Sequence, residues 1–448
     1  MEQAPAIAGP APRVKTSRTA LPADDRGDSY AGCGQKTAMS RGVLFVHNNF
    51  PGQFGGLAQA LMARGVPCIA VGQDHARGLE GVKIARYRLP RGSTPDIFPL
   101  AIRAEADLIR ARGAYDAAQA LKAEGWDPAV IVGHPGWGEM TFLSDIFPNA
   151  RKVTFAEFYY HGRGYDVGFD SEFQAPDLEA VLRAEAKNGM MAVAYAEADA
   201  IVAPTPFQAG ALPRRFRDAV RIIHEGVDVD VIRPAPPEPF TLDDGRVIQP
   251  GTPVITHVNN HMEPLRGLHI LARALPRLLA EVPDAQVLLI GDPNKKPYGA
   301  PAPDGKTWRD LCFQGVEYDP ARVHFLGRVP HARMLAALRL GVAHVYYTYP
   351  FVLSWSLSES MASGCYVIGS DTPPVRDAIK DGVNGRLLPF FDVEALSGAM
   401  IAACRDPEAS QPLRAAARVT AEAMFSRAKG REAWLSLLRE LGVRIPAA

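Results

Sequence analysis

Residues 343–370, AHVYYTYPFVLSWSLSESMASGCYVIGS, hold two apolar runs with a helical pattern between them. The first run, AHVYYTY, and the last, CYVIGS, have the length and the apolar content of buried strands. Between them Leu353, Leu357 and Met361 recur at helical spacing, and Gly364 follows as the expected end of the helix. This order predicts two parallel strands joined by a helix, which is the unit of a parallel sheet.

The same alternation continues along the chain on both sides of this unit. Strand, glycine-bearing loop and helix recur over residues 41–230, with apolar runs in VLFV (43–46), PAVIVG (128–133), RKVTF (151–155) and ADAIVAP (198–204). A second series includes VITHVNN (254–260), AQVLLIG (285–291) and VHFLG (323–327). The sequence therefore predicts an α/β fold of two Rossmann-like, doubly wound domains facing across a cleft. Ligands of such sheets lie beyond the carboxyl ends of the strands.

Changes in composition suggest where the domains begin and end. Residues 1–40 are rich in Ala, Pro, Gly and Ser without periodicity, and we expect a mobile tail there. We expect the first domain over 41–230 and the second over 231–425, opening with a connection rich in Pro, Gly and acids. Residues 426–448 predict a final amphipathic helix, with apolar positions at Trp434, Leu437, Leu438 and Leu441.

The bulk composition narrows the class of protein. The 448 residues carry 49 basic and 49 acidic side chains, so no overall charge points to nucleic acid as a partner. The five cysteines are odd in number, widely spaced and free of CxxC pairs, which argues against a disulfide framework or a zinc site. No acidic or histidine cluster with the spacing of a metal site is evident, and we expect no metal.

The same features bear on location. No apolar run reaches the roughly 18 to 20 residues that span a bilayer, and we expect a cytoplasmic protein. Peripheral contact with the inner face of the membrane remains compatible with this reading. The basic segment LPRRFRDAVRI (212–222) fits either an anionic acceptor or lipid surface, or a solvated helix end.

Glu359 is a lone carboxylate in an apolar and hydroxyl-rich segment. A helix that begins in a cleft offers unpaired N–H groups to a phosphate or diphosphate, and Ser354 and Ser356 add hydroxyl donors there. About one turn further in, Glu359 is placed to accept hydrogen bonds from vicinal hydroxyls such as those of a ribose. The alternative is a solvated acid on a helix surface, but its apolar flanks favour a carboxylate that needs partners.

The segment LSESMASGCYVIGSDTPPVRDAIKDGVNGRLL (357–388) resembles the C-terminal signature of the retaining, nucleotide-sugar-dependent glycosyltransferases of family four, which have the GT-B fold. The resemblance covers most of the chain from about residue 41. Together, the matching segments resemble a bacterial subgroup of these enzymes. The resemblance extends to VLFVHNNFPGQFGGLAQAL (43–61), EFYYHGRGYDVGFDSEF (157–173), EPLRGLHILARALP (263–276) and VHFLGRVPHARML (323–335). It implies transfer of a sugar, with retention, from a nucleoside diphosphate donor to a hydroxyl of a glycan, a lipid-linked or a protein acceptor, with no cofactor required.

The resemblance also implies roles for donor-side residues. The matching acid binds the nucleotide ribose, which gives that role to Glu359, and the strand end from Gly327 to Val329 faces the base. Two positions depart from the pattern. Phe351 stands where the family often has a second acid, and Asn260 stands where it usually has an arginine that grips the diphosphate. Arg266 then remains as the main cation, because an asparagine cannot neutralise charge.

On the acceptor side, the resemblance places His134 near the reacting sugar, and Glu157 ends a strand where it would line the cleft. We expect both to be catalytic, against the alternatives of a loop-structuring histidine and a structural ion pair. Gly52, Gly55 and Gly56 let backbone amides approach a donor or acceptor, or form a plain turn. The rival functions are a GT-B epimerase or phosphorylase, and a catalytically silent homologue that binds a nucleotide or partner.

Overall fold

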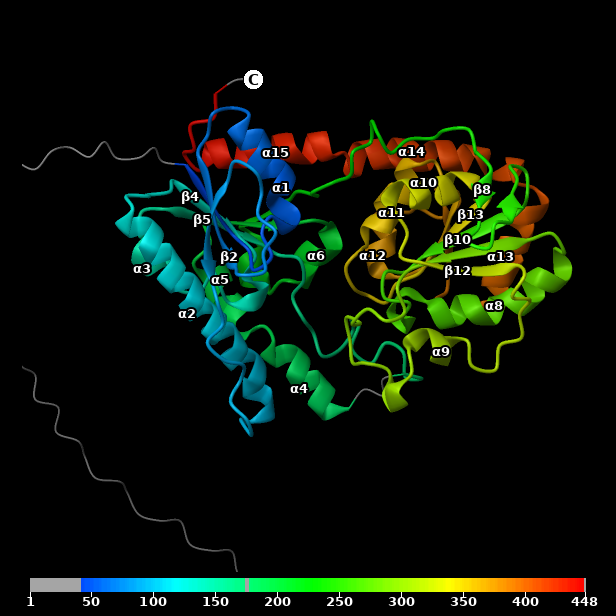
Figure 1. The fold of residues 1–448 in the computed structure, drawn as a ribbon, viewed down its shortest axis with the longest axis horizontal. Coiled ribbons are helices and arrows are strands. Elements are labelled where there is room, and N and C mark those ends of the chain that lie inside the picture. Colours follow the sequence, from blue (N-terminus) through cyan, green and yellow to red (C-terminus); the bar gives the residue numbers. More distant parts are fainter. Residues whose placement is uncertain (1–41, 174–176, 447–448) are drawn as a thin grey trace, which may run out of the picture. The chain divides into compact units, whose positions relative to one another are not determined.

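The computed structural model describes residues 42–173 and 177–446 (Figure 1). The predicted tail, residues 1–40, lies outside the described residues. The first part of the chain builds a seven-stranded sheet with the order β3-β2-β1-β4-β5-β6-β7. All of its pairings are parallel. Its strands are β1 (Val43–Val46), β2 (Cys68–Gln73), β3 (Lys83–Tyr87), β4 (Val130–Gly133), β5 (Arg151–Phe155), β6 (Ala200–Ala203) and β7 (Val220–Ile222).

Helices cover both faces of this sheet, because both faces of its central strands are apolar. Val43 and Phe45 of β1 point into one core, and Leu44 and Val46 point into the other. Each fully buried side chain of this size contributes about 2 kcal/mol. The helices of this half are α1 (Gly55–Met62), α2 (Ile102–Ala123), α3 (Leu143–Ile146), α4 (Leu178–Ala186), α5 (Gly189–Ala196), α6 (Pro206–Ala211) and α7 (Arg214–Arg217).

The second half builds a six-stranded sheet with the order β12-β11-β10-β13-β14-β15, again with parallel pairings only. Its strands are β10 (Val254–Val258), β11 (Gln286–Ile290), β12 (Val323–Gly327), β13 (Ala343–Tyr346), β14 (Val367–Ser370) and β15 (Arg386–Leu388). Its helices are α8 (Leu268–Glu281), α9 (Trp308–Cys312), α10 (His331–Leu340), α11 (Trp355–Ala362), α12 (Pro373–Arg376), α13 (Val393–Arg405) and α14 (Gln411–Met424). The predicted fold of two doubly wound domains is therefore confirmed.

The segment predicted as a simple connection contains a small hairpin. β8 (Phe240–Thr241) pairs antiparallel with β9 (Val247–Ile248), and Gly245 takes a positive φ of 88° in the turn between them. Phe240 and Ile248 are buried against α10 in the second half. The interpretation of this part as connection alone is wrong, because spaced apolar residues dock the turn-rich segment on the second core.

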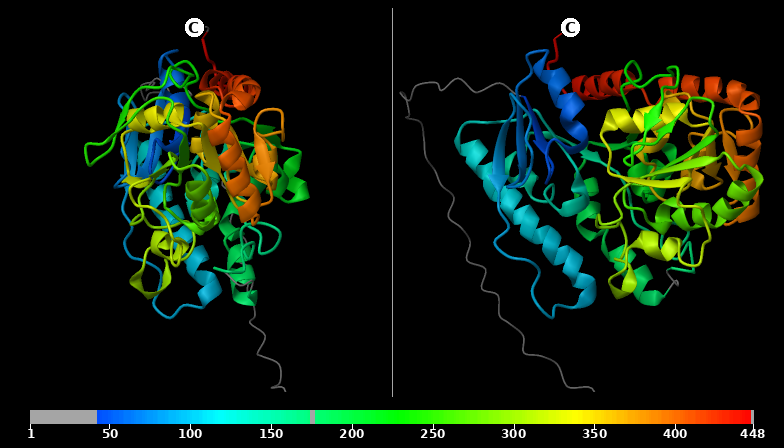
Figure 2. Two further views of the ribbon diagram at one scale, coloured as in Figure 1. Left: turned by 90° about the vertical axis from the view of Figure 1, so that its right-hand side faces the viewer. Right: turned by 45° about the vertical axis from the view of Figure 1, so that its right-hand side comes forward.

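The last helix, α15 (Arg427–Glu440), packs on α1 and not on the half that precedes it (Figures 1 and 2). Trp434 and Leu438 are buried in the same core as Phe45 and Phe54 of the first half. Residues 427–440 of the segment expected to form an amphipathic helix are thus helical, and their apolar side covers the core of the first half.

The chain thus passes between the halves twice, and the two passages are paired. Val227 and Ser426 form a parallel bridge. The N–H of Val227 donates to the carbonyl of Phe425 at 2.7 Å, and the N–H of Arg427 donates back to the carbonyl of Val227 at 2.9 Å. Among the described residues, no helix is both long enough and apolar enough to span a membrane.

Candidate functional site

A cavity of about 840 Å³ opens where the carboxyl ends of strands from the two sheets approach each other. From the first half it is lined by His47, Gly52, Gln53, Trp137 and Glu157. From the second half its walls include Asn260, Arg266, Arg328, Ser354, Ser356 and Glu359. The structure therefore brings most of the residues predicted from the sequence around one space.

Glu359 lies in α11 with 13% of its side chain exposed. Its Oε1 is 2.7 Å from Nε2 of His331, the first residue of α10. Burial raises the pKa of the Glu359 carboxyl, while His331 and then Arg427 oppose that rise. The sequence analysis missed His331, although its place just after the end of a parallel strand was a signal for it.

The first turn of α11 faces the same cavity. Ser354 is the N-cap residue, yet its hydroxyl does not cap the helix and lies 2.6 Å from that of Ser356. The N–H of Ser354 donates to the hydroxyl of Tyr346 at 2.8 Å. No side chain caps this helix among the described residues, and the N–H of Leu357 donates to the carbonyl of Ser354 at 3.1 Å. The N–H groups of Trp355 and Ser356 remain available to an anion.

Arg266 lines the cavity but is 4% exposed. Its NH1 group donates to Thr348 Oγ1 at 2.7 Å and to the carbonyl of Val352 at 2.8 Å. Within the described ranges, no carboxylate lies at ion-pair distance from it. The guanidinium therefore supports the chain that leads into α11 and keeps its positive charge for the cavity.

The glycine after this arginine is required by packing. Gly267 has a φ of 70°, and a Cβ there would lie 2.4 Å from Cβ of Tyr347. The nearby Glu263 is 3% exposed, and burial raises its pKa to about 7 although Arg266 opposes the rise. Oε2 of Glu263 accepts the N–H of Tyr298 at 3.2 Å, which ties down the insert at residues 292–310. Tyr298 lines the cavity, so this insert contributes to its wall.

The two departures from the family pattern have different surroundings. Phe351 is 8% exposed and packs edge-on against Phe158, with ring centroids 4.7 Å apart. Its place is apolar, so a carboxylate there would have no polar partner. Asn260 is exposed and lines the cavity. At the end of β12 the lining residue is Arg328, whereas Gly327 and Val329 on either side of it do not line the cavity.

His134 reaches the cavity through Glu157. Nδ1 of His134 accepts the N–H of Gly136 at 3.0 Å, so a neutral ring carries its proton on Nε2. That nitrogen lies 3.1 Å from Oε2 of Glu157, whose side chain is 44% exposed to the cavity. Desolvation in the cleft raises the pKa of Glu157, but His134, His47 and Gln53 together outweigh it, and the pKa lies below its usual value. Glu157 is thus an ionised group facing the cavity, with His134 behind it.

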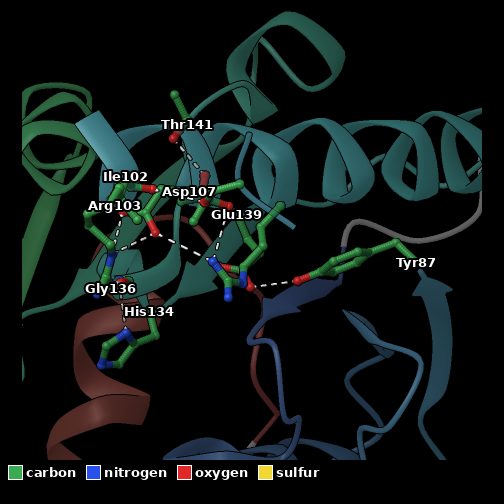
Figure 3. A network of polar contacts seen from close by, with 12 residues as sticks. Tyr87, Ile102, Arg103, Asp107, His134, Gly136, Glu139 and Thr141 are labelled. Atoms are coloured by element: carbon green, nitrogen blue, oxygen red, sulfur yellow. Dashed lines mark hydrogen bonds and ion pairs between the residues drawn. The ribbon is translucent and has the colours of Figure 1, made fainter. Parts of the chain in front are cut away.

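The turn that carries His134 is held by a polar network that the sequence did not indicate (Figure 3). Nε of Arg103 donates to both carboxylate oxygens of Asp107, at 2.8 and 2.9 Å, and its NH2 group donates to the carbonyl of Gly136. Asp107 is fully buried in α2, and burial raises its pKa against the effect of Arg103. Gly138 fits closely over it, since a Cβ there would lie 2.2 Å from the carbonyl oxygen of Asp107.

His47 is a second histidine at the cavity that sequence reasoning missed. It follows β1, and its ring centroid is 5.7 Å from that of His134 and 5.2 Å from that of Trp137. Burial, and then the proximity of His134, lower the pKa of His47 to about 4. His47 is therefore neutral near pH 7. A polar side chain ending the first strand was the signal for it.

The three glycines predicted to lie near the donor or acceptor, Gly52, Gly55 and Gly56, do not all line the first cavity. Gly52 lines the cavity with a φ of 47°, and a Cβ there would lie 2.5 Å from Nε2 of His47. Gly55 and Gly56 begin α1 and line a second, adjoining cavity. The basic residues of α7 do not line either cavity.

A group of potential metal ligands forms through the fold, although the sequence predicted none. Single ligand atoms of Asp170, Glu172 and His269 lie within 4.8 Å of one another. His269 stands about 100 residues after the two acids in the chain, so the spacing of the three gave no signal. Tyr349 and Arg273 already contact the two acids. The cysteines within the described ranges are free and buried, at Cys68, Cys312, Cys365 and Cys404.

Comparison with known proteins finds glycosyltransferase models in both halves of the chain. Residues 64–232 match the model of the glycosyl transferase family 4 group, and residues 252–406 match that of glycosyl transferases group 1. A phosphatidyl-myo-inositol mannosyltransferase of Mycolicibacterium smegmatis is 32% identical over 208 residues, which are 45% of this chain and 47% of that protein. The chain spans about half the length of this relative.

Solved structures extend the likeness of the fold over most of the chain. Sucrose-phosphate synthase from Thermosynechococcus elongatus superposes with a TM-score of 0.65 at 18% identity, covering 90% of this chain and 99% of its own. Anabaena HepE in complex with UDP gives 0.61 at 15% identity, covering 89% and 100%. Each half of the chain is thus similar to a glycosyltransferase domain, and the predicted GT-B fold is confirmed.

Proposed function

We propose that this protein transfers a sugar from a nucleoside diphosphate donor to a hydroxyl acceptor. The observation that carries the proposal is the composition of the 840 Å³ cavity. One wall offers a carboxylate, an arginine and an uncapped helix start, and the opposite wall offers an ionised carboxylate backed by a histidine. A cation and N–H groups suit a diphosphate, while carboxylates suit sugar hydroxyls.

In this proposal the second half holds the donor. Glu359 accepts hydrogen bonds from the ribose, and at the strand end from Gly327 to Val329 it is Arg328 that lines the cavity on the side of the base. Arg266, Ser354, Ser356 and the first turn of α11 face the diphosphate, with Asn260 as a neutral donor beside them. Negative charge grows on the diphosphate as it departs, and fixed donors stabilise that charge most at that moment.

The first half holds the acceptor. Glu157 accepts the hydrogen bond of the attacking hydroxyl, and His134 keeps that carboxylate ionised and oriented. Gly52, Gly55 and Gly56 leave room for the acceptor to approach. Glu157 thus contacts the substrate directly, whereas His134 acts on the substrate only through its hydrogen bond to Glu157.

The proposed chemistry proceeds with retention by a front-face route. The bond between the anomeric carbon and the phosphate oxygen breaks as the bond to the acceptor oxygen forms on the same face. The proton of the acceptor hydroxyl passes to the Glu157 carboxylate, and the diphosphate leaves with the electron pair of the broken bond. No cofactor enters these steps, and closure over the cavity would exclude water, which otherwise hydrolyses the donor.

The related proteins suggest the class of substrates. HepE was solved with UDP, and the mycobacterial relative is named for a phosphatidylinositol acceptor. We therefore propose a glycan or lipid-linked acceptor, with a protein acceptor as a further option, and peripheral contact with the cytoplasmic face of a membrane. The relative matches this chain over only part of its length, and the donor panel described next identifies the substrate.

The test is binding and turnover of a panel of UDP-, GDP- and ADP-sugars. We expect one donor class to bind by calorimetry and to release nucleoside diphosphate, and we expect Glu359→Ala and Arg266→Ala each to weaken binding at least about tenfold. Binding without release for any acceptor would favour the rival of a silent nucleotide-binding homologue. Failure of every donor to bind would refute the proposed site.

A further inference from the structure

A second cavity, of about 730 Å³, lies between α1 and α15. It shares Gly52, Gln53, Glu225 and Trp355 with the first cavity, so the two are continuous. We propose that this second cavity binds an anionic group, a phosphate or a carboxylate, carried by the acceptor one unit away from the attacking hydroxyl. Its role as an acceptor subsite rests on the proposed function, whereas its affinity for anions does not.

Three arginines make the second cavity positively charged and rich in hydrogen-bond donors. Arg64 of α1 and Arg427 and Arg431 of α15 line it. Arg427 is exposed, and within the described part of the chain its guanidinium has neither an ion pair nor a hydrogen bond. The Nε atoms of Arg64 and Arg431 are buried without an acceptor among the described residues. Donors of this kind match the oxygens of a phosphate or carboxylate.

The acids nearby do not cancel this charge. Arg64 and Arg431 share one carboxylate, Glu432, whose Oε1 lies 3.3 Å from NH2 of Arg64 and 4.0 Å from Nε of Arg431. Glu432 is exposed and does not line the cavity. Asp228 lines the cavity, but its Oδ1 accepts the backbone N–H groups of Asp230 and Val231. Three arginines thus face the same space as two acids, Asp228 and Glu225.

The residues that line both cavities favour hydrogen-bond donors over anions. Oε2 of Glu225 and Oε1 of Gln53 are buried without a donor among the described residues. Acceptors without a donor suit hydroxyl groups, because each hydroxyl supplies a hydrogen. The polar atoms thus change from acceptors at the boundary with the first cavity to donors at the far end.

Trp355 completes the boundary. Its ring is 51% exposed, and its Nε1 donates to Oε1 of Glu225 at 3.0 Å, which fixes the ring between the two cavities. A fixed, exposed indole offers a flat apolar surface to a sugar ring. Gly55 and Gly56 have no side chains that would narrow the second cavity. A Cβ on Gly56 would lie 3.9 Å from Cδ of Arg427, in space that a ligand could occupy. A sugar over Trp355 would place its substituent near the arginines.

The experiment measures binding of glucose 6-phosphate, glucuronate and neutral glucose by calorimetry at low salt. The proteins are wild type, Arg427→Gln/Arg431→Gln, Arg266→Ala, and the control Arg112→Gln on the exposed face of α2. We expect one or both anions to bind wild type more tightly than glucose, to weaken with salt and to lose at least about tenfold in the double variant. Arg266→Ala and Arg112→Gln should keep this binding. Which anion binds decides between phosphate and carboxylate.

Three outcomes would overturn the inference. They are equal binding by the double variant and wild type, loss of anion binding in Arg266→Ala alone, and no preference for either anion over glucose. A single variant, Arg427→Glu, repeats the test at an exposed position where folding is not at stake. The donor panel is measured separately on wild type and on the double variant. Failure of every donor to bind wild type, with anion binding to wild type intact, would refute the proposed function but leave the anion site standing.

Discussion

Nε2 of His331 lies 2.7 Å from Oε1 of Glu359, so two helices of the second half meet at the carboxylate proposed to bind the ribose. Burial raises the pKa of Glu359, and His331 is the strongest opposing influence. In His331→Ala the pKa of Glu359 should rise further, so that more of the carboxyl is protonated at mildly acidic pH. Donor affinity should fall about two- to tenfold near pH 5.5 and less near pH 8.

The measurement is the donor dissociation constant across this pH range. His75→Ala, at an exposed histidine outside the cavity, should match wild type throughout. A uniform loss at all pH values would mean that His331 contacts the donor directly and does not act through Glu359.

Glu263 should make stability depend on pH. Burial raises its pKa in the folded protein to about 7, above the ordinary value of 4.5. The folded state holds the proton more tightly, so stability falls as pH rises from about 4.5 to about 7, and the loss is complete above that range. The shift corresponds to ~3 kcal/mol. Glu263→Gln should be nearly as stable as wild type at pH 4.5 and more stable at pH 8.

Urea unfolding at both pH values tests this, with Glu408→Gln as the exposed control. The glutamine keeps an oxygen for the N–H of Tyr298, so the insert should stay in place. An unchanged difference between pH 4.5 and pH 8 would contradict the assignment of the proton to Glu263.

The ion pair behind His134 should matter for both stability and turnover. Arg103→Leu leaves the carboxylate of Asp107 fully buried, with Arg110 at 3.8 Å as its remaining partner. Because an uncompensated buried charge is costly, we expect a loss of about 2–4 kcal/mol. Arg103→Leu/Asp107→Leu should recover much of that loss but not the turnover, since the carbonyl of Gly136 still lacks its donor. Unfolding curves and kcat of the three proteins test the two parts.

Glu157 and His134 should differ in kinetics. Glu157→Gln removes the charge that faces the acceptor and should lower kcat by about 10²- to 10⁴-fold with little change in donor affinity. His134→Gln keeps a hydrogen bond to Glu157 and should cost less. Equal losses of donor affinity in both variants would place these residues on the donor side. Because the pKa of Glu157 lies below its usual value, its ionisation should not limit kcat between pH 6 and 8.

The parallel strands and their order along the chain were predictable because each is a short apolar run of the kind seen in Val43–Val46. The hairpin at Phe240–Ile248 was not, because its two-residue strands are too short to give a period. At the site, Glu359 was found from its unusual neighbours. Arg103 and Asp107 were not found, because an arginine followed four residues later by an acid is an ordinary pair on a helix surface. Only the fold, in which Gly138 packs over α2, shows that Asp107 is buried.

The paired passages at Val227 and Ser426 give the two sheets a connection with two parallel chains instead of one. A single chain is a tether, about which a domain turns in any direction, whereas two bonded chains favour rotation about one axis. The paired passages therefore limit the directions in which the two halves can turn relative to each other. A protein ending at Phe425 would keep every residue that lines the first cavity, yet it would lose this restriction and the helix that covers the core of the first half.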